Sequence, residues 1–256
     1  MKKQAGFTLL EIMIALLLGL IVVGATISIY IATVGSSAST IRSSRLNHDL
    51  ESVMTLMIND IRRAGYWGGA ADNVDDSNLF TNENAADGAV TDIKILEAGT
   101  CILYSYDANN DTVVNDDEFY GFKLQNNSIL MRLSGSSTTD CDDEDDTWQN
   151  FVDNSQLTIT TVQFSFAPID ANADGDTTDA GDLPATSRCW NQTQKTSTDQ
   201  LTCTGGTNGD YIIQNRMVNI QLTGRVSSEA NVTKTLLGTA EVRNNRICVW
   251  DGATCP

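Results

Sequence analysis

Histidine is almost absent from this sequence, since the 256 residues include only His48. Most acid–base and nucleophilic catalytic sites place a histidine beside another reactive side chain, so one histidine leaves little room for them. The chain also lacks the GxSxG, P-loop and HExxH patterns of hydrolases, nucleotide-binding proteins and zinc proteases. We therefore expect the protein not to be an enzyme.

Basic residues are also scarce. The chain has 16 lysines and arginines against 33 aspartates and glutamates, which gives a formal net charge of −17. No basic cluster is larger than the pair Arg62-Arg63. Such a chain repels nucleic acid, so nucleic acid is not an expected partner. Only three prolines are present, which excludes a proline-rich linker and favours a folded domain.

Charge is missing altogether between Ile12 and Ile41. The apolar part of this stretch, from Ile12 to Ile31, has the roughly 20 residues that a helix needs to cross a bilayer. Lys2 and Lys3 precede it, and positive charge stays on the cytoplasmic side of a membrane segment. The pattern predicts a membrane-spanning helix with a cytoplasmic N-terminus.

The residues before the apolar run are unusual for a secretory signal peptide. Such a peptide is cleaved at a small residue that follows its apolar core, whereas Gly6 lies before the run. Cleavage at Gly6 would keep the apolar segment. Glu11 places a carboxylate at the edge of the bilayer core, which costs several kcal/mol unless the charge is paired. An ordinary membrane anchor is the alternative, but it leaves Glu11 unexplained.

The stretch Gly6-Phe7-Thr8-Leu9-Leu10-Glu11 resembles the processing motif of type IV prepilins. The resemblance implies that a prepilin peptidase cuts after Gly6 and that Phe7 becomes the N-methylated first residue of the mature chain. It also implies that Glu11 pairs with the free N-terminus of a neighbouring subunit. Such a pair offsets the cost of burying both charges, and a misdocked subunit would leave one charge unpaired.

A second helical pattern follows the apolar run. Apolar residues recur at spacings of three and four, which marks one face of a helix; they are Leu46, Leu50, Val53, Met57 and Ile61. We predict one helix from about Phe7 to Ala64, ended by Gly65, with this apolar stripe packed on a sheet. Short alternating runs after Gly69 predict strands at residues 101–107, 118–125, 128–134, 157–169, 211–226 and 234–244.

These elements predict an α+β protein with a pilin fold. A long N-terminal helix, whose first half spans the membrane, would pack on an antiparallel β-sheet globular domain. Asn126-Asn127 predicts a tight hairpin turn within that sheet. The expected organisation is a leader at 1–6, a transmembrane and filament-core helix at 7–35, its amphipathic second half at 36–66, and a β-rich periplasmic or extracellular domain at 67–256.

Two further stretches, "INDIRRAGYWG" and "VNIQLTGRV…TAEVRNNR", resemble PilW-type minor pilins. The resemblance implies a structural subunit that initiates or caps a type IV pilus, a fibre used in adhesion, twitching motility and DNA uptake. The implied partners are prepilin peptidase, other minor pilins, the major pilin, the inner-membrane assembly platform and a tip adhesin. The protein would lie in the inner membrane first and in the pilus fibre at the cell surface later. A J-type pseudopilin of type II secretion and a tip-located adhesive module remain as alternatives.

Six cysteines follow the apolar helix: Cys101, Cys141, Cys189, Cys203, Cys248 and Cys255. They lie on the side predicted to be periplasmic, where disulfides persist. Among the many pairings that six cysteines allow, we favour the sequential one: Cys101–Cys141, Cys189–Cys203 and Cys248–Cys255. A zinc site is a weaker alternative, because the sequence has no CxxC pair and His48 is distant from the cysteines.

The stretch "DANNDTVVNDDE" has the spacing of a calcium loop. Its candidate ligands are Asp107, Asn109, Asp111, the carbonyl of Val113, Asn115 and Glu118. Thr112 stands where the sharp turn of such loops prefers glycine, and the flanking residues predict strands instead of helices. The alternative is an acidic solvated turn, because aspartate, asparagine and glycine all favour turns.

A second stretch, "DANADGDTTDAGD", opens in the same way and has Gly175 at the turn position. Its candidate ligands are Asp170, Asn172, Asp174, Asp176 and Asp179. Gly181 replaces the closing glutamate, so Asp179 or Asp182 would have to complete the site. Calcium is therefore the one cofactor that we expect. The run "DCDDEDD" at residues 140–146 lacks this spacing, and we predict a solvated loop there.

Overall fold

The computed structural model describes residues 6–71, 78–83, 88–179, 181–184, 186–198 and 206–251. The chain divides into two compact units, Met1–Arg45 and Leu46–Pro256. Helix α1, Leu9–Ile61, is continuous across the boundary between them. It begins and ends a few residues inside the predicted limits of Phe7 and Ala64, so the prediction of one long helix is confirmed.

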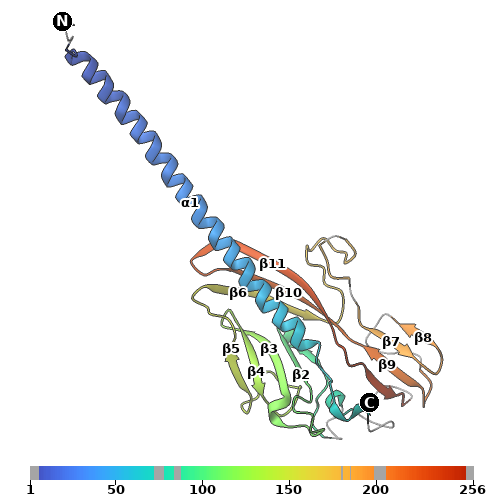
Figure 1. Cartoon of the computed structure of the whole chain (residues 1–256). Coiled ribbons are helices and arrows are strands. Elements are labelled where there is room, and N and C mark those ends of the chain that lie inside the picture. Colours follow the sequence, from blue (N-terminus) through green and yellow to red (C-terminus); the bar gives the residue numbers. More distant parts are fainter. Residues whose placement is uncertain are drawn as a thin grey trace. The chain divides into compact units, whose positions relative to one another are not determined.

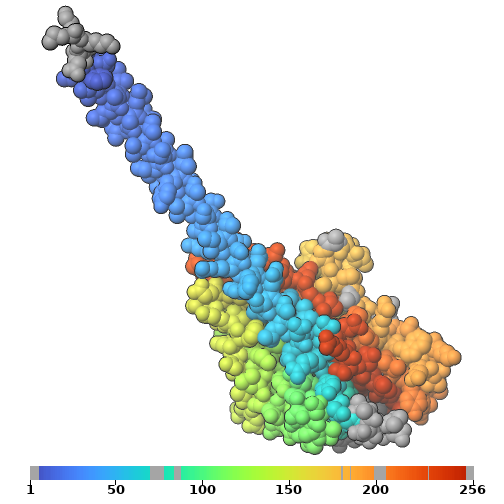
Figure 2. All heavy atoms as spheres, in the orientation of Figure 1, coloured from blue at the N-terminus to red at the C-terminus, as the bar shows by residue number. Residues whose placement is uncertain are grey.

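In the second unit, the apolar stripe of α1 forms one wall of the main hydrophobic core. Leu46, Leu50, Val53, Met57 and Ile61 are all buried, as the spacing predicted, and Met54 joins them. The same core takes in apolar side chains of two sheets. Figure 2 shows the opposite face of this part of the helix open at the surface between the segments coloured green to yellow and those coloured red. The helix is therefore amphipathic where it meets the sheets.

The described strands form three antiparallel sheets (Figure 1). The five-stranded sheet, in the order β1-β2-β3-β4-β5, comprises β1 Lys94–Leu96, β2 Cys101–Ser105, β3 Phe119–Gln125, β4 Ser128–Ser134 and β5 Thr147–Asn150. The three-stranded sheet, in the order β11-β10-β6, comprises β6 Leu157–Ser165, β10 Met217–Val226 and β11 Glu229–Glu241. The four-stranded sheet, in the order β12-β9-β7-β8, comprises β7 Arg188–Asn191, β8 Thr196–Thr198, β9 Tyr211–Asn215 and β12 Arg246–Val249.

One long helix followed by antiparallel sheets is an α+β architecture of the pilin type, so the predicted fold class is confirmed. The hairpin between β3 and β4 also forms at Asn126-Asn127, where both residues have a positive φ, as a tight two-residue turn requires. The short strands β1, β5, β7, β8 and β12 were not predicted. Strands of three or four residues give too little alternation to be recognised in the sequence.

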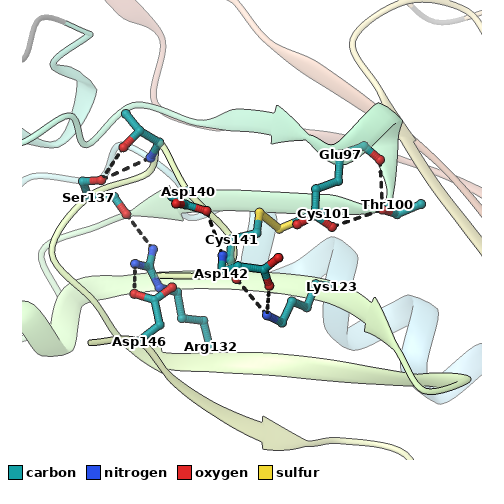
Figure 3. Close-up of a disulfide and its surroundings, with 11 residues drawn as sticks. Glu97, Thr100, Cys101, Lys123, Arg132, Ser137, Asp140, Cys141, Asp142 and Asp146 are labelled. Carbon is teal, nitrogen blue, oxygen red and sulfur yellow. Dashed lines mark hydrogen bonds and ion pairs between the residues drawn. A yellow bond between two sulfur atoms is a disulfide. The ribbon is translucent and has the colours of Figure 1, made fainter. Parts of the chain in front are cut away.

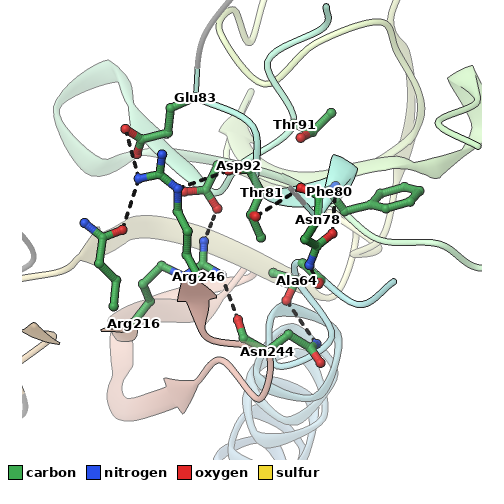
Figure 4. Close-up of polar contacts among 12 residues, drawn as sticks. Ala64, Asn78, Phe80, Thr81, Glu83, Thr91, Asp92, Arg216, Asn244 and Arg246 are labelled. Atoms are coloured by element: carbon green, nitrogen blue, oxygen red, sulfur yellow. Dashed lines mark hydrogen bonds and ion pairs between the residues drawn. The ribbon is translucent and has the colours of Figure 1, made fainter. Parts of the chain in front are cut away.

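One predicted strand proves to be two. The run 211–226 divides at Arg216 into β9, which pairs with β7 and β12, and β10, which pairs with β6 and β11. The Arg216 guanidinium is buried, where it binds the Asp92 carboxylate and donates to the Asn244 carbonyl (Figure 4). A buried arginine needs such partners. Arg216 lies between β9 and β10, where the chain passes from one sheet to another.

The helix approaches the three-stranded sheet closely at two glycines. A Cβ atom at Gly224 of β10 would lie 2.8 Å from the Leu50 side chain, and one at Gly238 of β11 would lie 2.8 Å from Ile58. On the five-stranded sheet, the Tyr104 hydroxyl donates to the Asp60 carboxylate at 2.6 Å. The last turns of α1 are therefore fixed between two sheets by apolar packing and by a hydrogen bond.

Candidate functional site

The first candidate site is the start of α1. Thr8 and Glu11 form a capping box: the Glu11 amide donates to the Thr8 hydroxyl at 3.3 Å, and the Thr8 amide donates to the Glu11 carboxylate at 2.9 Å. This reciprocal pair explains why the helix begins at Leu9. Gly6 and Phe7 precede the helix and are exposed, Phe7 to 84%. The predicted cleavage site therefore lies in an accessible, non-helical segment, as a peptidase requires.

The apolar part of α1 has no charged side chain after Glu11 until Arg42. It is long and apolar enough to cross a membrane, with a mean hydropathy of 2.7 over its best 18 residues. Its hydroxyl groups donate to carbonyls three or four residues earlier, as Thr26, Ser28 and Thr33 do. Because these polar groups have partners within the helix, they do not oppose its entry into lipid.

The second candidate site is the loop between β2 and β3, which contains the predicted ligands of the first calcium loop. The Asp107 amide donates to the Tyr66 carbonyl at 2.9 Å, and Asp107 Oδ2 accepts from the amides of Gly68 at 2.9 Å and Thr112 at 3.2 Å. At its far end, the Glu118 carboxylate accepts from the amides of Ala108 and Asn115. The loop is thus joined to the segment that follows α1.

Three predicted ligands converge in this loop. Asp107, Asp111 and Glu118 each offer a carboxylate oxygen, and these oxygens lie within 4.8 Å of one another. Asp107 and Glu118 are buried, each with 1% exposure. Burial raises the pKa of Glu118, and the charge of Asp107 raises it further. The loop therefore holds a concentrated negative charge that is partly withdrawn from water.

The remaining predicted ligands lie around this cluster. The Asn109 and Asn115 side-chain amides donate to Asp111 Oδ2, and the Asn115 amide also reaches the Val113 carbonyl at 3.2 Å. Hydrogen bonds to Asp111, foremost from the Val113 amide, lower the pKa of its carboxyl group. Thr112 adopts a φ of 66°, so the left-handed turn that usually falls to glycine forms here with a β-branched residue.

The second acidic loop gathers a different set of carboxylates. Asp174, Asp176, Asp179 and Asp182 lie within reach of one another, and all are exposed or half-buried. Both carboxylate oxygens of Asp170 accept backbone hydrogen bonds, from Ala173 and Gly175. Asp170 lies outside this cluster, and the Asn172 amide donates to Asp174 and Asp179. The neighbouring Asp174 carboxylate raises the pKa of Asp179.

Cys101 and Cys141 form the disulfide that the sequence favoured (Figure 3). It joins β2 to the acidic run at residues 140–146. Cys189 and Cys248 are also disulfide-bonded. Their predicted partners, Cys203 and Cys255, lie outside the described residues. His48 is on the surface of α1, with its side chain 83% exposed.

The prediction of a solvated loop at residues 140–146 is wrong for part of that run. The Asp146 side chain is fully buried against the Arg132 guanidinium, and burial raises the pKa of Asp146 (Figure 3). Asp142 pairs with the buried ammonium of Lys123 at 2.9 Å. Both cations come from the inner strands β3 and β4, and a buried cation requires a nearby carboxylate. The acidic run supplies these partners.

Sequence reasoning missed two kinds of residue at these sites. Thr8 caps α1, although the pair Thr8 and Glu11 has the three-residue spacing of a capping box. Gly68 and Tyr66 contact the first acidic loop, the latter through a 2.8 Å hydrogen bond from its hydroxyl to Asn110 Oδ1. No local signal could reveal these last contacts, because they join positions about forty residues apart.

Residues 39–242 match the family described as prepilin peptidase-dependent protein B. This chain belongs to that family. Residues 1–27 of this prepilin peptidase-dependent protein also match the prokaryotic N-terminal methylation motif, which contains the Gly6–Glu11 stretch. No curated protein and no solved structure matches the chain.

The two family matches cover residues 1–27 and 39–242 of this prepilin peptidase-dependent protein. It is a type IV pilin-like protein, with a methylation motif, an apolar helix suited to membrane anchoring, and a globular domain of antiparallel sheets. The family implies processing by prepilin peptidase and assembly with other pilins. The domains of such proteins are structural.

Proposed function

We propose that this protein is a minor pilin of a type IV pilus, which initiates or caps assembly of the fibre and has no enzymatic activity. The observation that carries the proposal is the N-terminal helix. Glu11 is the one charge in a long apolar surface, and every side chain from Phe7 to Ser37 is exposed. Such a surface is stable in lipid before assembly and against equivalent helices within a fibre.

Glu11 supplies the specificity of that assembly. Its carboxylate bonds to Thr8. Cleavage after Gly6 would create an ammonium group on Phe7 of each subunit. In the dry interior of a bundle of apolar helices, this ammonium and the Glu11 carboxylate of a neighbour would attract one another strongly. A subunit docked in the wrong register would leave both charges unpaired, which makes the pair a check on correct docking.

The globular unit supports a minor role in the fibre. It contains three sheets and two acidic loops beyond the helix, a larger body than the most abundant subunit of a fibre usually carries. The resemblance of the helix exit and the last strands to PilW-type pilins points in the same direction. We infer as partners prepilin peptidase, the major pilin, other minor pilins, the inner-membrane assembly platform and a tip adhesin. The subunit would enter the inner membrane with its N-terminus in the cytoplasm.

The proposal is tested by replacing the gene in its own bacterium. Deletion should abolish or strongly reduce surface pili, counted by electron microscopy, and the wild-type gene should restore them. Glu11→Ala should fail to restore pili, although the protein is still made and cleaved. Thr8→Val is the matched control, because it removes the capping hydroxyl and keeps the carboxylate. It should cost about 1 kcal/mol at the start of the helix and still allow assembly.

The same strains separate the alternatives. Unchanged piliation with a loss of type II secretion would assign the protein to a secretion system as a pseudopilin. Normal fibres that no longer bind surfaces would assign it to a tip-located adhesive module. Equal loss of pili in the Thr8→Val and Glu11→Ala strains would show that Glu11 acts as a helix cap and not as a docking group.

A further inference from the structure

Asp107 has a buried oxygen atom without a partner. The residue is 1% exposed, and its Oδ2 accepts hydrogen bonds from the amides of Gly68 and Thr112. Its Oδ1 is inaccessible and accepts no hydrogen bond from any described residue. An ionised oxygen that is removed from water without a donor or cation is strongly unfavourable. A positive charge at this oxygen would remove the penalty.

The surroundings of the Asp107 carboxylate are themselves negative. Asp111 and Glu118 each place a carboxylate oxygen within 4.8 Å of one from Asp107. The ion pairs formed by lysines and arginines of the described chain involve other carboxylates. Two oxygens bound to one calcium ion at 2.3–2.6 Å are at most about 5 Å apart, so the observed spacing suits a shared ion.

We propose that the loop from Asp107 to Glu118 binds one calcium ion through the carboxylates of Asp107, Asp111 and Glu118. The donors are all oxygen atoms, which hard cations prefer, and zinc would require nitrogen or sulfur. The loop also carries the Val113 carbonyl and the Asn115 side chain beside Asp111, as further oxygen donors. An oxygen-rich loop with several protein ligands favours calcium over magnesium, which demands a stricter octahedral geometry.

The second acidic loop provides a comparison within the same chain. Its opening residues have the same spacing, and it has the same left-handed turn, at Gly175. Both oxygens of Asp170, the counterpart of Asp107, accept backbone hydrogen bonds, from Ala173 at 2.6 Å and from Gly175 at 2.9 Å. Asp170 therefore has the partners that Asp107 lacks. In the second loop the buried oxygen without a partner is instead Oδ2 of Asp182, a half-buried residue of that cluster, so the two loops differ in which aspartate carries it.

The position of the loop gives the ion a structural role. Asp107 bonds to Tyr66 and Gly68 through its main chain and side chain, and the Gly65 amide donates to the Ser105 carbonyl at 2.8 Å. These contacts join the segment that leaves α1 to the end of β2. An ion that fixes Asp107 would therefore hold the helix exit on the five-stranded sheet. Calcium would make the globular unit more resistant to unfolding, whichever filament it joins.

The test uses the full chain purified in detergent, with terbium as a luminescent substitute for calcium. Tyr66 donates a hydrogen bond to Asn110 within the loop, so an ion bound there should be sensitised by tyrosine excitation. We expect saturable terbium emission that calcium displaces and magnesium displaces poorly. Thermal unfolding in calcium should occur at a higher temperature than in chelator.

Matched variants decide where the ion binds. Asp111→Asn removes one ligand charge at an exposed position and should weaken terbium and calcium binding by about tenfold or more. Asp107→Asn should do the same, with its fold checked by circular dichroism. Asp117→Asn is the control, because it makes the same change at an exposed residue of the same loop outside the cluster.

Three results would overturn the proposal. The first is a wild-type chain without sensitised emission and without a calcium-dependent melting temperature. The second is an Asp111→Asn variant that binds terbium and calcium as tightly as the wild type. The third is loss of binding only in Asp174→Asn, which would place the ion in the second loop. None of these results bears on piliation, so they leave the proposed function to its own test.

Discussion

Arg216 and Asp92 form an ion pair in the interior of the globular unit, with their side chains 1% and 3% exposed. Nearby, Arg246 donates to the carbonyl of Thr81 and to the side chain of Gln214, and it pairs with Glu83 (Figure 4). Glu83 and Asp92 precede β1, whereas Arg216 directly follows β9 and Arg246 is the first residue of β12. The pair therefore joins distant parts of the chain at the point where β9 turns into β10.

Breaking this pair on one side should be far more damaging than removing it. Asp92→Asn leaves the Arg216 charge buried without its carboxylate, and we expect a loss of about 3–5 kcal/mol in the free energy of unfolding. The double variant Asp92→Leu/Arg216→Met should recover a large part of that loss. Lys94→Met is the control, because Lys94 pairs with Glu83 at 3.3 Å while 31% exposed, and it should lose about 1 kcal/mol or less. Urea unfolding of the three variants measures these differences.

The Cys101–Cys141 disulfide should contribute strongly to stability. It closes a loop with a sequence separation of 40, for which the chain-entropy relation gives about 4 kcal/mol. The variant Cys101→Ser/Cys141→Ser should therefore unfold at a lower urea concentration than the wild type by a corresponding amount. Peptide mapping without reduction should recover the linked Cys101 and Cys141 peptides. A double variant as stable as the wild type would show that the packing of Lys123 and Trp148 holds this region instead.

Thr112 should be a point of local strain that glycine relieves. A β-branched residue at a φ of 66° is unfavourable by about 1 kcal/mol relative to glycine, so Thr112→Gly should raise the free energy of unfolding by up to that amount. The neighbouring Val113→Gly is the control, since Val113 has no left-handed conformation to relieve, and it should lower stability. Calorimetry in chelator measures both. A destabilised Thr112→Gly would mean that the threonine side chain makes a compensating contact.

Glu118 should make stability depend on pH when calcium is removed. Its pKa in the folded protein is raised, first by burial and then by the charge of Asp107. The folded state therefore holds the proton more firmly than the unfolded state. The contribution of the protonated Glu118 carboxyl group to the free energy of unfolding is complete at pH values below the ordinary glutamate pKa. It is lost as the pH rises through the raised pKa of the folded protein.

Glu118→Gln should remove this component of the pH profile, because glutamine cannot ionise and still keeps one acceptor oxygen. The measurement is the difference in unfolding free energy between variant and wild type across the acid range, in chelator. Glu51→Gln, at an exposed position of α1, serves as the control and should leave the profile unchanged. If the free energy of unfolding of the wild type and of Glu118→Gln changed in parallel at every pH, the pH dependence could not be assigned to Glu118.

Part of the candidate sites could be predicted because their signals are local. The spacing of the first acidic loop identified Asp107, Asp111 and Glu118, which the fold brings together. It could not reveal that Asp107 Oδ1 is buried without a partner, because that burial depends on Tyr66 and Gly68. In the second loop the same spacing pointed to Asp170, which lies outside the cluster of carboxylates, and to Asp179 or Asp182 as the closing ligand, both of which lie within it.

The sequence by itself determined the processing motif, the charge-free run, the continuous helix and its apolar stripe. Each of these depends on residues within a few positions of one another, where helical periodicity and motif spacing apply directly. The tertiary structure alone decided that the strands form three sheets, that Arg216 divides a strand, and that Asp146 is buried. These features arise from contacts between distant segments, whose free energy depends on which charges and strand edges must be satisfied together inside the folded protein.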